Sequence, residues 1–582
     1  MPQSTFSTLR SYIRPYWHKT ALGIAALLVV NGIGAYIPQL IRNAIDKLEV
    51  TFSFNQILQA AIIVLVLASV MWAMRMVSRI LIFGVGRQVE FDLKQRIFRH
   101  LLTLEPAYFE RVKPGEIISR ATSDVDNIRR LVGFAVLSLA NTLFAYALTL
   151  PFMVTINLRL TLAALVVYPI MLFMVSLFSE RLRDEQQKAQ EETANISDLI
   201  QEDMSGMALI KIYSQEDNER QAFRQLNHQL LNANLSLGRT RNTLFPLLSG
   251  LASISLLVIL AFGAGAIANG VLSVGDFVAL LLYVERLVFP TALLGFTITA
   301  YQRGEVSIAR IQEILTVVPS IQDDRDALPL PRDEVQGHIE ARQLTYRYPD
   351  ADQPALNEVT FTVAPGETAA IVGPIGSGKS TLANTIPYLL DIDAGQLFID
   401  GQDITTLRIQ DLRGAIAYVP QDSFLFSTSI RNNIRYGDPT AEQSDVELAA
   451  KQAQIHSEIL NFPKQYDTLV GERGITLSGG QRQRTALARA LLVDAPILIL
   501  DDALSSVDSR TASAILDNLS GGTAQKTVVF ISHQMSAAAT ADRIFVMDQG
   551  RIVQTGSHSR LLRQVGLYQQ LWEQNQREEV LQ

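Results

Sequence analysis

The residues best suited to chemistry lie in the run from Gly373 to Ser380, which reads GPIGSGKS. Glycines at this spacing let successive backbone N–H groups turn toward an anion at the start of a helix, with no Cβ in the way. Lys379 would reach the β- and γ-phosphates of a nucleotide, and the Ser380 hydroxyl would complete a Mg²⁺ shell. An ordinary glycine-rich turn is the weaker interpretation, because every position of the pattern is matched. The residues expected to bind a nucleoside triphosphate here are Gly373, Gly376, Ser377, Gly378, Lys379, Ser380 and Thr381.

The flanking segments have the character that such a loop needs. Ala369–Val372 is an apolar, strand-like run, and Thr381–Leu390 has a helical pattern. A second glycine-rich run, Leu477–Gln481, also precedes a strongly helical stretch, Arg482–Leu492. It supplies another candidate phosphate site at a helix N-terminus, made of Ser478, Gly479, Gly480 and Gln481. Since the two sites lie far apart in the chain, we expect each to close on a nucleotide held by another subunit.

Two adjacent carboxylates follow the run Ile497–Asp501, which is continuously apolar up to its last residue. This pattern is typical of a buried parallel strand. Asp501 is therefore expected to hold Mg²⁺ from the end of the strand. Asp502 follows where a catalytic base or water-orienting group is needed.

Three further polar or aromatic residues gain meaning from their order along the chain. Gln421 follows the predicted strand Ala415–Val419, and its amide suits a Mg²⁺ ion or the attacking water. His533 ends the predicted strand Val528–Ser532 and can hydrogen-bond a γ-phosphate or the water. Tyr348 precedes the glycine run and is placed to stack on a purine base.

Composition separates the chain into two halves. The mean hydropathy of +0.18 with 18% charged residues is high for a soluble enzyme, and long uncharged runs crowd the first three hundred residues. The net charge of −7 gives no reason to expect nucleic-acid binding. The absence of cysteine excludes disulfides, thiolate metal sites and cysteine nucleophiles.

Six segments are long and apolar enough to cross a bilayer as helices. They are Thr20–Ile41, Gln56–Met74, Leu131–Leu158, Leu160–Ser179, Phe245–Asn269 and Val274–Tyr301. The connections Arg75–Arg130 and Glu180–Arg241 are long and rich in Lys and Arg, and they read as helix continuing past the bilayer. The positive-inside rule puts both connections, and both termini, in the cytoplasm. Number, length and charge asymmetry argue against the alternative, the buried helices of a soluble core.

Two charged residues, Glu285 and Arg286, stand inside the sixth segment. Charges in membrane spans are costly and either serve a transport path or are satisfied structurally. We favour a structural ion pair, or a site near the membrane surface, over direct substrate contact. Prolines are also expected to kink their helices, because each removes a backbone hydrogen bond. These are Pro38, Pro151, Pro169 and Pro290.

A linker near residue 330 is marked by Leu328-Pro329-Leu330-Pro331, where hydrophobicity has already fallen. The predicted fold is therefore multidomain. An all-α transmembrane domain of six helices, with long cytoplasmic extensions, occupies residues 1–330. An α/β P-loop ATPase domain occupies residues 331–582.

These motifs, in this order and over essentially the whole chain, resemble those of ATP-binding-cassette (ABC) exporters, as half-transporters of the multidrug or lipid-exporting kind. The resemblance implies the type IV exporter fold, ATP and Mg²⁺ as cofactors, and a dimer with a second half-transporter. Ser505–Asp508 is similar to the D-loop, and Val470–Gly474 to a segment that touches the membrane domain. The other motifs match as follows: Tyr348 the A-loop, Gly373–Ser380 Walker A, Gln421 the Q-loop, Leu477–Gln481 the signature, Asp501 Walker B and His533 the switch histidine.

The chain departs from the family at Asp502, where the family has a catalytic glutamate. The shorter side chain withdraws the carboxylate by about 1 Å, and such a displacement can cost on the order of 10²-fold in rate. The site on these Walker motifs should therefore bind ATP but hydrolyse it slowly. The chain thus resembles the degenerate-site subunit of a heterodimeric exporter whose partner carries glutamate at this position.

The expected function is ATP-driven export of amphipathic drugs or lipids across the cytoplasmic membrane. The catalytic set is Lys379, Gln421, Asp502 and His533, and the metal ligands are Ser380, Gln421 and Asp501. Tyr108–Asp124 and Ile210–Asn218 are the expected docking regions for the ATPase domains. The alternatives are a homodimeric lipid flippase and an ATP-gated regulatory or channel-like membrane protein with little turnover. A soluble ATPase acting on nucleic acid fits neither the six spans nor the acidic balance.

Overall fold

The computed structural model describes residues 5–50, 54–349, 351–471, 474, 476–507, 511–512, 514–516 and 526–581. The chain forms two compact units. The first comprises Met1–Leu102 and Val112–Val317, and the second comprises Thr103–Arg111 and Val318–Gln582. Ile321 and Leu330 are buried in the core of the second unit.

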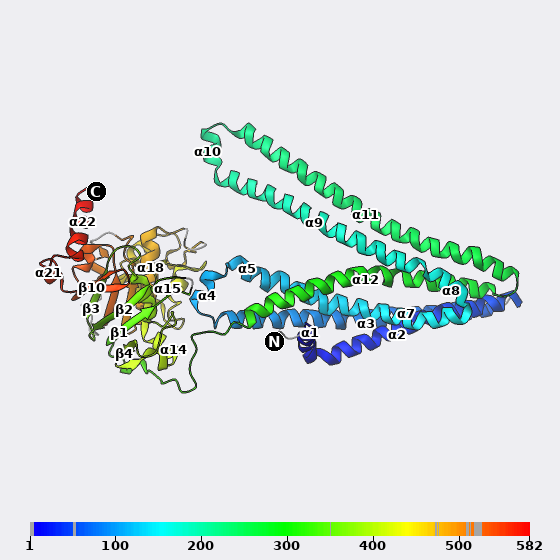
Figure 1. Ribbon diagram of the computed structural model, residues 1–582, viewed down its shortest axis with the longest axis horizontal. Coiled ribbons are helices and arrows are strands. Elements are labelled where there is room, and N and C mark those ends of the chain that lie inside the picture. Colours follow the sequence, from blue (N-terminus) through cyan, green and yellow to red (C-terminus); the bar gives the residue numbers. More distant parts are fainter. Residues whose placement is uncertain are drawn as a thin grey trace. The chain divides into compact units, whose positions relative to one another are not determined.

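The first unit consists of long helices, and α9 (Val167–Ser205) and α11 (Glu216–Ala268) run side by side in it (Figure 1). Six helical stretches are long and apolar enough to span a membrane, as predicted. They are Ser7–Leu48, Phe54–Leu101, Pro114–Ile156, Leu158–Ser205, Glu216–Ala268 and Val274–Leu315. Each has more residues than the roughly 20 that cross a bilayer core, as helices that continue past the membrane would.

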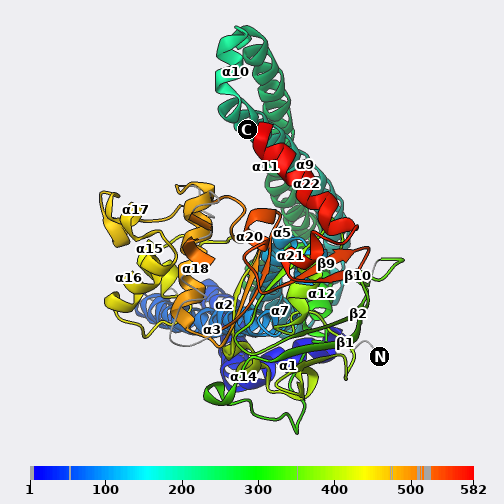
Figure 2. The same cartoon turned by 90° about the vertical axis from the view of Figure 1, so that its left-hand side faces the viewer.

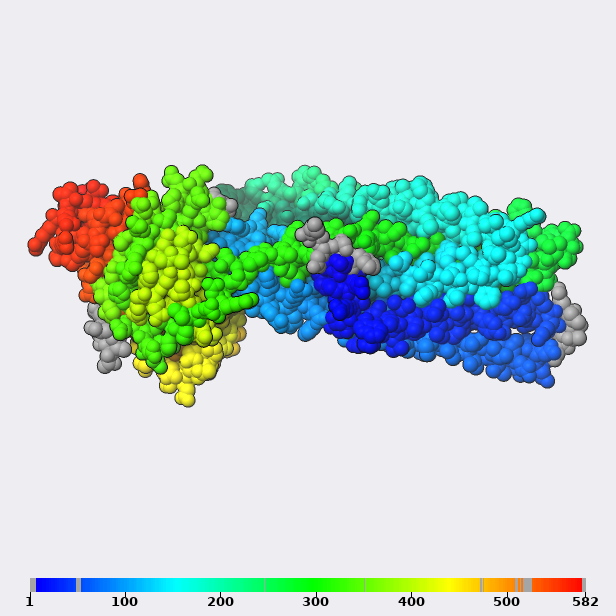
Figure 3. Space-filling view, turned by 60° about the horizontal axis from the view of Figure 1, so that its bottom comes forward, coloured from blue at the N-terminus to red at the C-terminus, as the bar shows by residue number. Residues whose placement is uncertain are grey.

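The helices of this unit have the following bounds: α1 (Thr5–Ile13), α2 (Trp17–Val50), α3 (Phe54–Leu101), α5 (Pro114–Ser119), α6 (Val125–Arg130), α7 (Val136–Ile156), α8 (Leu158–Leu165), α9 (Val167–Ser205), α10 (Met207–Ile212), α11 (Glu216–Ala268) and α12 (Val274–Leu315). Two π-helical turns, Arg120–Asp124 and Leu131–Ala135, interrupt the third stretch. Figure 3 shows α2, in dark blue, lying along the lighter blue α3, with which it packs extensively.

Capping residues define the two tight turns between spans. The Asn157 side chain accepts a hydrogen bond from the N–H of Leu160 at 3.1 Å and so starts α8. Ser273 starts α12 with a capping box, since its hydroxyl accepts from the N–H of Asp276 at 2.9 Å. Both turns lie where hydrophobicity predicted them. Of the four prolines, Pro169 lies just after the break between α8, which ends at Leu165, and α9. Pro169 has no N–H, so it cannot donate a helical hydrogen bond to the carbonyl of Leu165.

A polar cluster at the last turns of α2 joins this helix to the start of α12. Arg42 pairs with Asp276 (Nε to Oδ1, 2.6 Å), and the N–H of Gly275 donates to Asp46 at 3.0 Å. A Cβ at Gly275 would collide with Asp46, so glycine is needed there. Farther along, the Tyr283 hydroxyl donates to the carbonyl of Ala35 at 2.9 Å. We call this set of contacts the α2–α12 clasp.

The expected ion pair between Glu285 and Arg286 is not formed. Neighbouring residues on a helix point about 100° apart, so the two side chains leave α12 toward different partners. Arg286 donates to the carbonyl and side-chain oxygens of Asn31, at 3.1 and 3.3 Å. Glu285 lines a groove with apolar residues of α11, such as Leu256 and Leu260. The structural ion pair was therefore the wrong expectation.

The second unit is built on a six-stranded sheet with the order β10-β9-β3-β8-β7-β6, beside a four-stranded sheet with the order β2-β1-β4-β5. Strands β9, β3, β8, β7 and β6 run parallel, and β10 is antiparallel to β9. The strand bounds are β1 (Ile339–Tyr346), β2 (Leu356–Val363), β3 (Thr368–Val372), β4 (Leu397–Ile399), β5 (Gln402–Asp403), β6 (Ile416–Val419), β7 (Ile497–Asp501), β8 (Thr527–Ile531), β9 (Arg543–Asp548) and β10 (Arg551–Gly556).

Helices cover the parallel strands on both faces, which explains their continuous apolar runs. Ala370 and Val372 of β3 enter one hydrophobic core, whereas Ala369 and Ile371 enter the other. Figure 2 shows α15, α16 and α18 gathered as a group. The helices of this unit are α4 (Pro106–Arg111), α13 (Lys379–Thr385), α14 (Ile409–Gly414), α15 (Ile430–Ile434), α16 (Gln443–Gln452), α17 (His456–Leu460), α18 (Gly479–Val493), α20 (Met535–Ala538), α21 (His558–Leu561) and α22 (Leu567–Leu581).

Candidate nucleotide-binding site

The predicted site residues follow the carboxyl ends of four neighbouring parallel strands. The glycine run follows β3, Gln421 follows β6, Asp501 ends β7 with Asp502 directly after it, and His533 follows β8. The carboxyl ends of parallel strands meet at one edge of a sheet, where α/β proteins bind ligands. Sheet topology therefore brings these residues together although more than 150 positions separate Lys379 from His533.

A cavity of about 240 Å³ lies at this edge. Nine of the predicted residues line it: Gly376, Gly378, Lys379, Ser380, Thr381, Gln421, Asp501, Asp502 and His533. Ala355, Ile375 and Ile531 complete the lining and were not predicted. The arrangement is a polar pocket with cationic, hydroxyl and carboxylate groups facing a small volume.

The glycine run is held in a shape that leaves its backbone open toward the cavity. Gly378 has φ +96°, and a Cβ on it would lie 2.6 Å from the carbonyl oxygen of Ala355. The N–H of Gly550 anchors the loop by donating to the carbonyl of Ser377 at 3.1 Å. Among the described residues, the buried Ser377 hydroxyl has no hydrogen-bond partner. A cradle with a spare buried donor fits phosphate oxygens.

Lys379 is 6% exposed and lies within the loop that it follows. Its Nζ donates to the carbonyls of Gly373 at 2.9 Å and Pro374 at 2.8 Å. Burial lowers the pKa of Lys379, and the charges of Asp502 and Asp501 partly offset that effect. The carboxylates favour the charged form of Lys379, and its hydrogen bonds to neutral carbonyls leave that charge available to pair with a polyanion.

Ser380 and Asp501 provide adjacent oxygen ligands, since the Ser380 hydroxyl donates to Asp501 Oδ1 at 3.0 Å. Burial raises the pKa of Asp501. The hydrogen bond from Ser380 lowers this pKa in part, and the neighbouring charge of Asp502 raises it further. Carboxylate and hydroxyl oxygens are the ligands that Mg²⁺ prefers, and a cation would relieve the desolvation of Asp501. The residues present therefore fit a nucleotide with Mg²⁺.

Asp502 occupies a strained position at the end of β7. Its φ is +49°, in the left-handed region that aspartate tolerates better than most residues. Its N–H donates to Ile531 at 3.2 Å, and its carbonyl accepts from the Ser505 hydroxyl at 2.9 Å. In the described structure, its buried Oδ1 has no hydrogen-bond partner. The backbone is thus fixed on both sides while the carboxylate is left to serve the cavity.

Tyr348 lies beside the cavity and is not part of its lining. Its hydroxyl is 3.4 Å from the Thr381 hydroxyl, and its ring meets that of Tyr346 edge to face at 5.0 Å. The side chains of Gln421 and His533 are exposed. All three positions are compatible with the predicted contacts to a base, a metal or a γ-phosphate.

The second glycine-rich run does not enter this cavity. Ser478 caps α18, where its hydroxyl accepts from the N–H of Gln481 at 3.2 Å. The side-chain oxygen of Gln481 accepts a hydrogen bond from the N–H of Ser478 at 3.0 Å, and its side-chain nitrogen donates to Glu458. Of the other predicted motif residues, Asp508, Glu472 and Arg473 lie outside the described residues.

Several side chains around the site were missed at the sequence level. The Tyr418 hydroxyl donates to Asn384 at 2.7 Å and approaches Asp501 Oδ2 at 3.5 Å. Gln483 bridges the carbonyl of Asp502 and the Ser505 hydroxyl, at 3.4 and 2.9 Å. Sequence signals for them were weak, because Tyr418 resembles an ordinary strand aromatic and Gln483 an ordinary polar helix residue.

Comparison with known proteins agrees with this geometry. Residues 20–291 match a family model described as the ABC transporter transmembrane region, and residues 356–505 match one described as ABC transporter. The multidrug resistance-like ATP-binding protein MdlA of Escherichia coli is 33% identical over 99% of this chain and 97% of that protein. The ATP-dependent lipid A-core flippase of Syntrophus aciditrophicus is 30% identical over 97% of this chain and 94% of that protein. A solved structure, a bacterial Atm1-family ABC exporter with ATP bound, aligns with a TM-score of 0.77 at 27% identity, covering 97% of this chain and 99% of the other.

Proposed function

The chain belongs to the ABC transporters, and from this premise we propose that it exports amphipathic drugs or lipids as one half of a heterodimer. It is a multi-pass membrane protein and an ATPase-coupled transporter with the exporter architecture. The names of its relatives, a multidrug resistance-like protein and a lipid A-core flippase, support this substrate class.

One observation carries the proposal for a dimer. The cavity gathers the glycine cradle, both aspartates, Gln421 and His533, yet Ser478–Gln481 stays outside it. The serine and glycines of that run are then available to a nucleotide held by a second subunit, as are those of the second subunit to this cavity. ATP bound between two such halves is neutralised from both sides.

The roles proposed within the cavity follow from its chemistry. Lys379 stabilises negative charge on the phosphates, and Ser380, Asp501 and Gln421 hold Mg²⁺. His533 and Asp502 orient the attacking water, and the short Asp502 side chain makes this step slow. A partner with glutamate at that position would supply the competent site, so the complex as a whole turns over.

We also propose the domain bounds, the membrane orientation and the regions that couple the domains. The transmembrane domain is residues 1–330 and the ATPase domain residues 331–582. The protein lies in the cytoplasmic membrane with both termini inside the cell. Tyr108–Asp124 and Ile210–Asn218 transmit closure of the ATPase domains to the membrane helices.

The proposal is tested by export from the assembled complex after Lys379→Ala or Ser478→Ala. Each change should reduce ATP-driven efflux of a fluorescent amphiphile by about 10²-fold or more, because each removes a group that stabilises phosphate charge. Lys451→Ala, an exposed lysine of α16, is the matched control and should leave efflux unchanged. Full efflux in both site variants would refute the proposal.

An ATP-gated channel with little turnover is the second candidate, favoured by Asp502 alone. Accumulation of the amphiphile against its gradient in inside-out vesicles, dependent on hydrolysable ATP, distinguishes a pump from such a channel. Co-purification of the chain from its native membrane identifies the second subunit. A brisk, substrate-stimulated ATPase from this chain by itself would contradict the heterodimer.

A further inference from the structure

Three arginines line one cavity of about 250 Å³ inside the first unit. Arg75 and Arg79 come from consecutive turns of α3, and Arg286 comes from α12. Asn31, Ser138 and Asn141 add polar groups, and no carboxylate belongs to the lining formed by the described residues. The rest of the wall is apolar and consists of Leu27, Val30, Leu137, Ala145, Phe289, Pro290 and Leu293.

Arg286 is fixed in the wall of this cavity by neutral partners. Asn31 accepts two hydrogen bonds from its Nη2, and the Asn31 amide in turn donates to Asn141 at 3.0 Å. The guanidinium lies against Gly34, where a Cβ would overlap it. Within the part of the chain that the structure describes, its buried Nε has no hydrogen-bond partner. The charge of Arg286 is therefore oriented without being neutralised.

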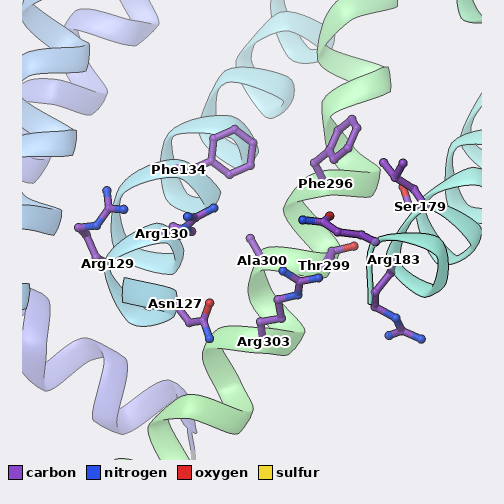
Figure 4. A pocket seen from close by; sticks show the side chains of 12 residues that line it. Asn127, Arg129, Arg130, Phe134, Ser179, Arg183, Phe296, Thr299, Ala300 and Arg303 are labelled. Atoms are coloured by element: carbon purple, nitrogen blue, oxygen red, sulfur yellow. The ribbon is translucent and has the colours of Figure 1, made fainter. Parts of the chain in front are cut away.

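A neighbouring cavity of about 490 Å³ in the same unit is lined by four arginines, Arg129, Arg130, Arg183 and Arg303 (Figure 4). Arg129 and Arg130 both pair with Asp126, at 2.8 Å from Arg129 Nε and 2.7 Å from Arg130 Nε. Arg183 lies 3.6 Å from Asp184. Arg303 forms no ion pair with any described residue, and the same holds for Arg75, Arg79 and Arg286 around the smaller cavity. Glu285 lines a separate groove.

Arg75 and Arg79 are exposed, whereas Arg286 is half-buried inside a membrane span. Three guanidinium groups without an ion-pair partner around one cavity favour the binding of an anion there. Charged groups in spans are costly, face cavities or the bundle interior, and mark substrate paths. A guanidinium binds phosphate or carboxylate in a planar, two-point manner that an ammonium cannot match. The apolar wall beside the arginines suits hydrocarbon, so the lining has the character of an amphiphile with an anionic head.

We propose that Arg75, Arg79 and Arg286 bind the anionic phosphate or carboxylate head of an exported amphiphile. This inference rests on the proposed export function and narrows its substrate class to anionic amphiphiles. It also reverses the expectation that Arg286 is purely structural. Arg286 supplies the fixed contact, and Arg75 and Arg79 supply charge from the facing helix.

The test uses the assembled transporter reconstituted in phosphatidylcholine nanodiscs. Phosphatidic acid and phosphatidylcholine with identical acyl chains are compared as titrants for binding and ATPase stimulation, with inorganic phosphate as the free-anion arm. Phosphatidic acid should bind at least about tenfold more tightly than phosphatidylcholine. Arg286→Gln and Arg79→Gln should each remove most of this preference, whereas Arg286→Lys should retain part of it. Arg130→Gln, whose charge is already paired with Asp126, is the matched control and should keep the preference.

Each outcome decides the matter. Loss of the preference in the arginine variants, with no competition by inorganic phosphate, supports a lipid headgroup as the source of the anion. Competition by millimolar phosphate supports the same site with a free anion as its ligand. Equal binding of both lipids by the wild type, or an unchanged preference in both glutamine variants, overturns the inference. Export of a neutral amphiphile by the wild type, measured in parallel, shows whether the proposed function survives that result.

Discussion

Asp502 joins two features that rarely coincide, a left-handed backbone and an unpartnered buried carboxylate oxygen. We predict that Asp502→Glu raises ATP hydrolysis at this site by about 10- to 100-fold, because the added methylene moves the carboxylate about 1 Å toward the water. Steady-state ATPase of the assembled transporter measures the effect. Asp502→Asn, which keeps the length and removes the charge, should give no increase. A rate for Asp502→Glu at or below wild type would show that Asp502 already has the reach it needs.

Asp501 is a buried carboxylate, and burial disfavours its charged form. Burial raises the pKa of Asp501 in the folded state above the value of about 3.9 in the unfolded state. At a pH between the unfolded and the folded pKa, the folded state therefore binds more protons than the unfolded state. Stability from this group is thus present below about pH 4 and is lost as pH rises through the folded pKa. Asp501→Asn should therefore raise the melting temperature of the nucleotide-free protein near neutral pH by about 2–4 °C, while Mg²⁺-dependent ATP binding is lost.

Calorimetry across pH checks this prediction. The advantage of Asp501→Asn over wild type should grow with pH over that window and then level off. Thr405→Ala, away from the cavity, serves as a control for the baseline. A variant that melts below wild type at every pH would mean that the Ser380–Asp501 hydrogen bond outweighs the burial of charge.

Among the single residues of the site, the sequence predicted those whose spacing determines the conformation of the backbone. The cradle from Gly376 to Thr381 and the two aspartates could be predicted, because glycine spacing and a carboxylate after an apolar run have one common explanation. Tyr418 and Gln483 could not, since their roles depend on which strands are neighbours. The ion pair expected for Glu285 and Arg286 was mispredicted, because residues adjacent in sequence point in different directions on a helix and Arg286 bonds Asn31 instead.

Helix packing in the first unit depends on close approach at a few glycines. At Gly304 of α12, a Cβ would lie 2.6 to 3.1 Å from side-chain atoms of Leu131, one of them the Leu131 Cβ. Gly304→Ala should destabilise the protein by about 1–3 kcal/mol through overpacking. Thermal unfolding in detergent measures this, and Leu131→Ala in the same chain should restore part of the loss.

Gly32→Ala in α2 is the matched control, since nothing lies within 4 Å of a Cβ placed there. It should be neutral or slightly stabilising, because alanine favours helix over glycine. Equal destabilisation by the two alanine substitutions would mean that backbone flexibility, and not the contact with Leu131, explains the glycine at 304.

The elements themselves were largely predictable, and for a simple reason. Composition predicts long apolar helices and buried parallel strands, such as Val274–Leu315 and Ile497–Asp501. The β9–β10 hairpin was missed, although β9 is a buried apolar strand and β10 alternates between half-buried and exposed positions. The π-helical turns of the third stretch, which lie against α12 and in part against α3, were not predicted from composition.

The whole chain lacks cysteine, so its membrane topology can be mapped with single introduced thiols. Gly270→Cys, in the turn before α12, should react with an impermeant maleimide added to intact cells. Ser214→Cys, in the turn between α10 and α11, should react only after the membrane is opened. These outcomes follow from the concentration of Lys and Arg in the long connections. The reverse pattern would invert the orientation and rule out export as the direction of transport.

The α2–α12 clasp limits where an exit can form. An ion pair, a carboxylate on a backbone amide and a tyrosine on a carbonyl tie these two helices at successive levels. Separating them would break the Arg42–Asp276 ion pair and the hydrogen bonds from Gly275 to Asp46 and from Tyr283 to Ala35. We therefore expect α2 and α12 to move together during transport, and any opening for a transported molecule to form between other helices.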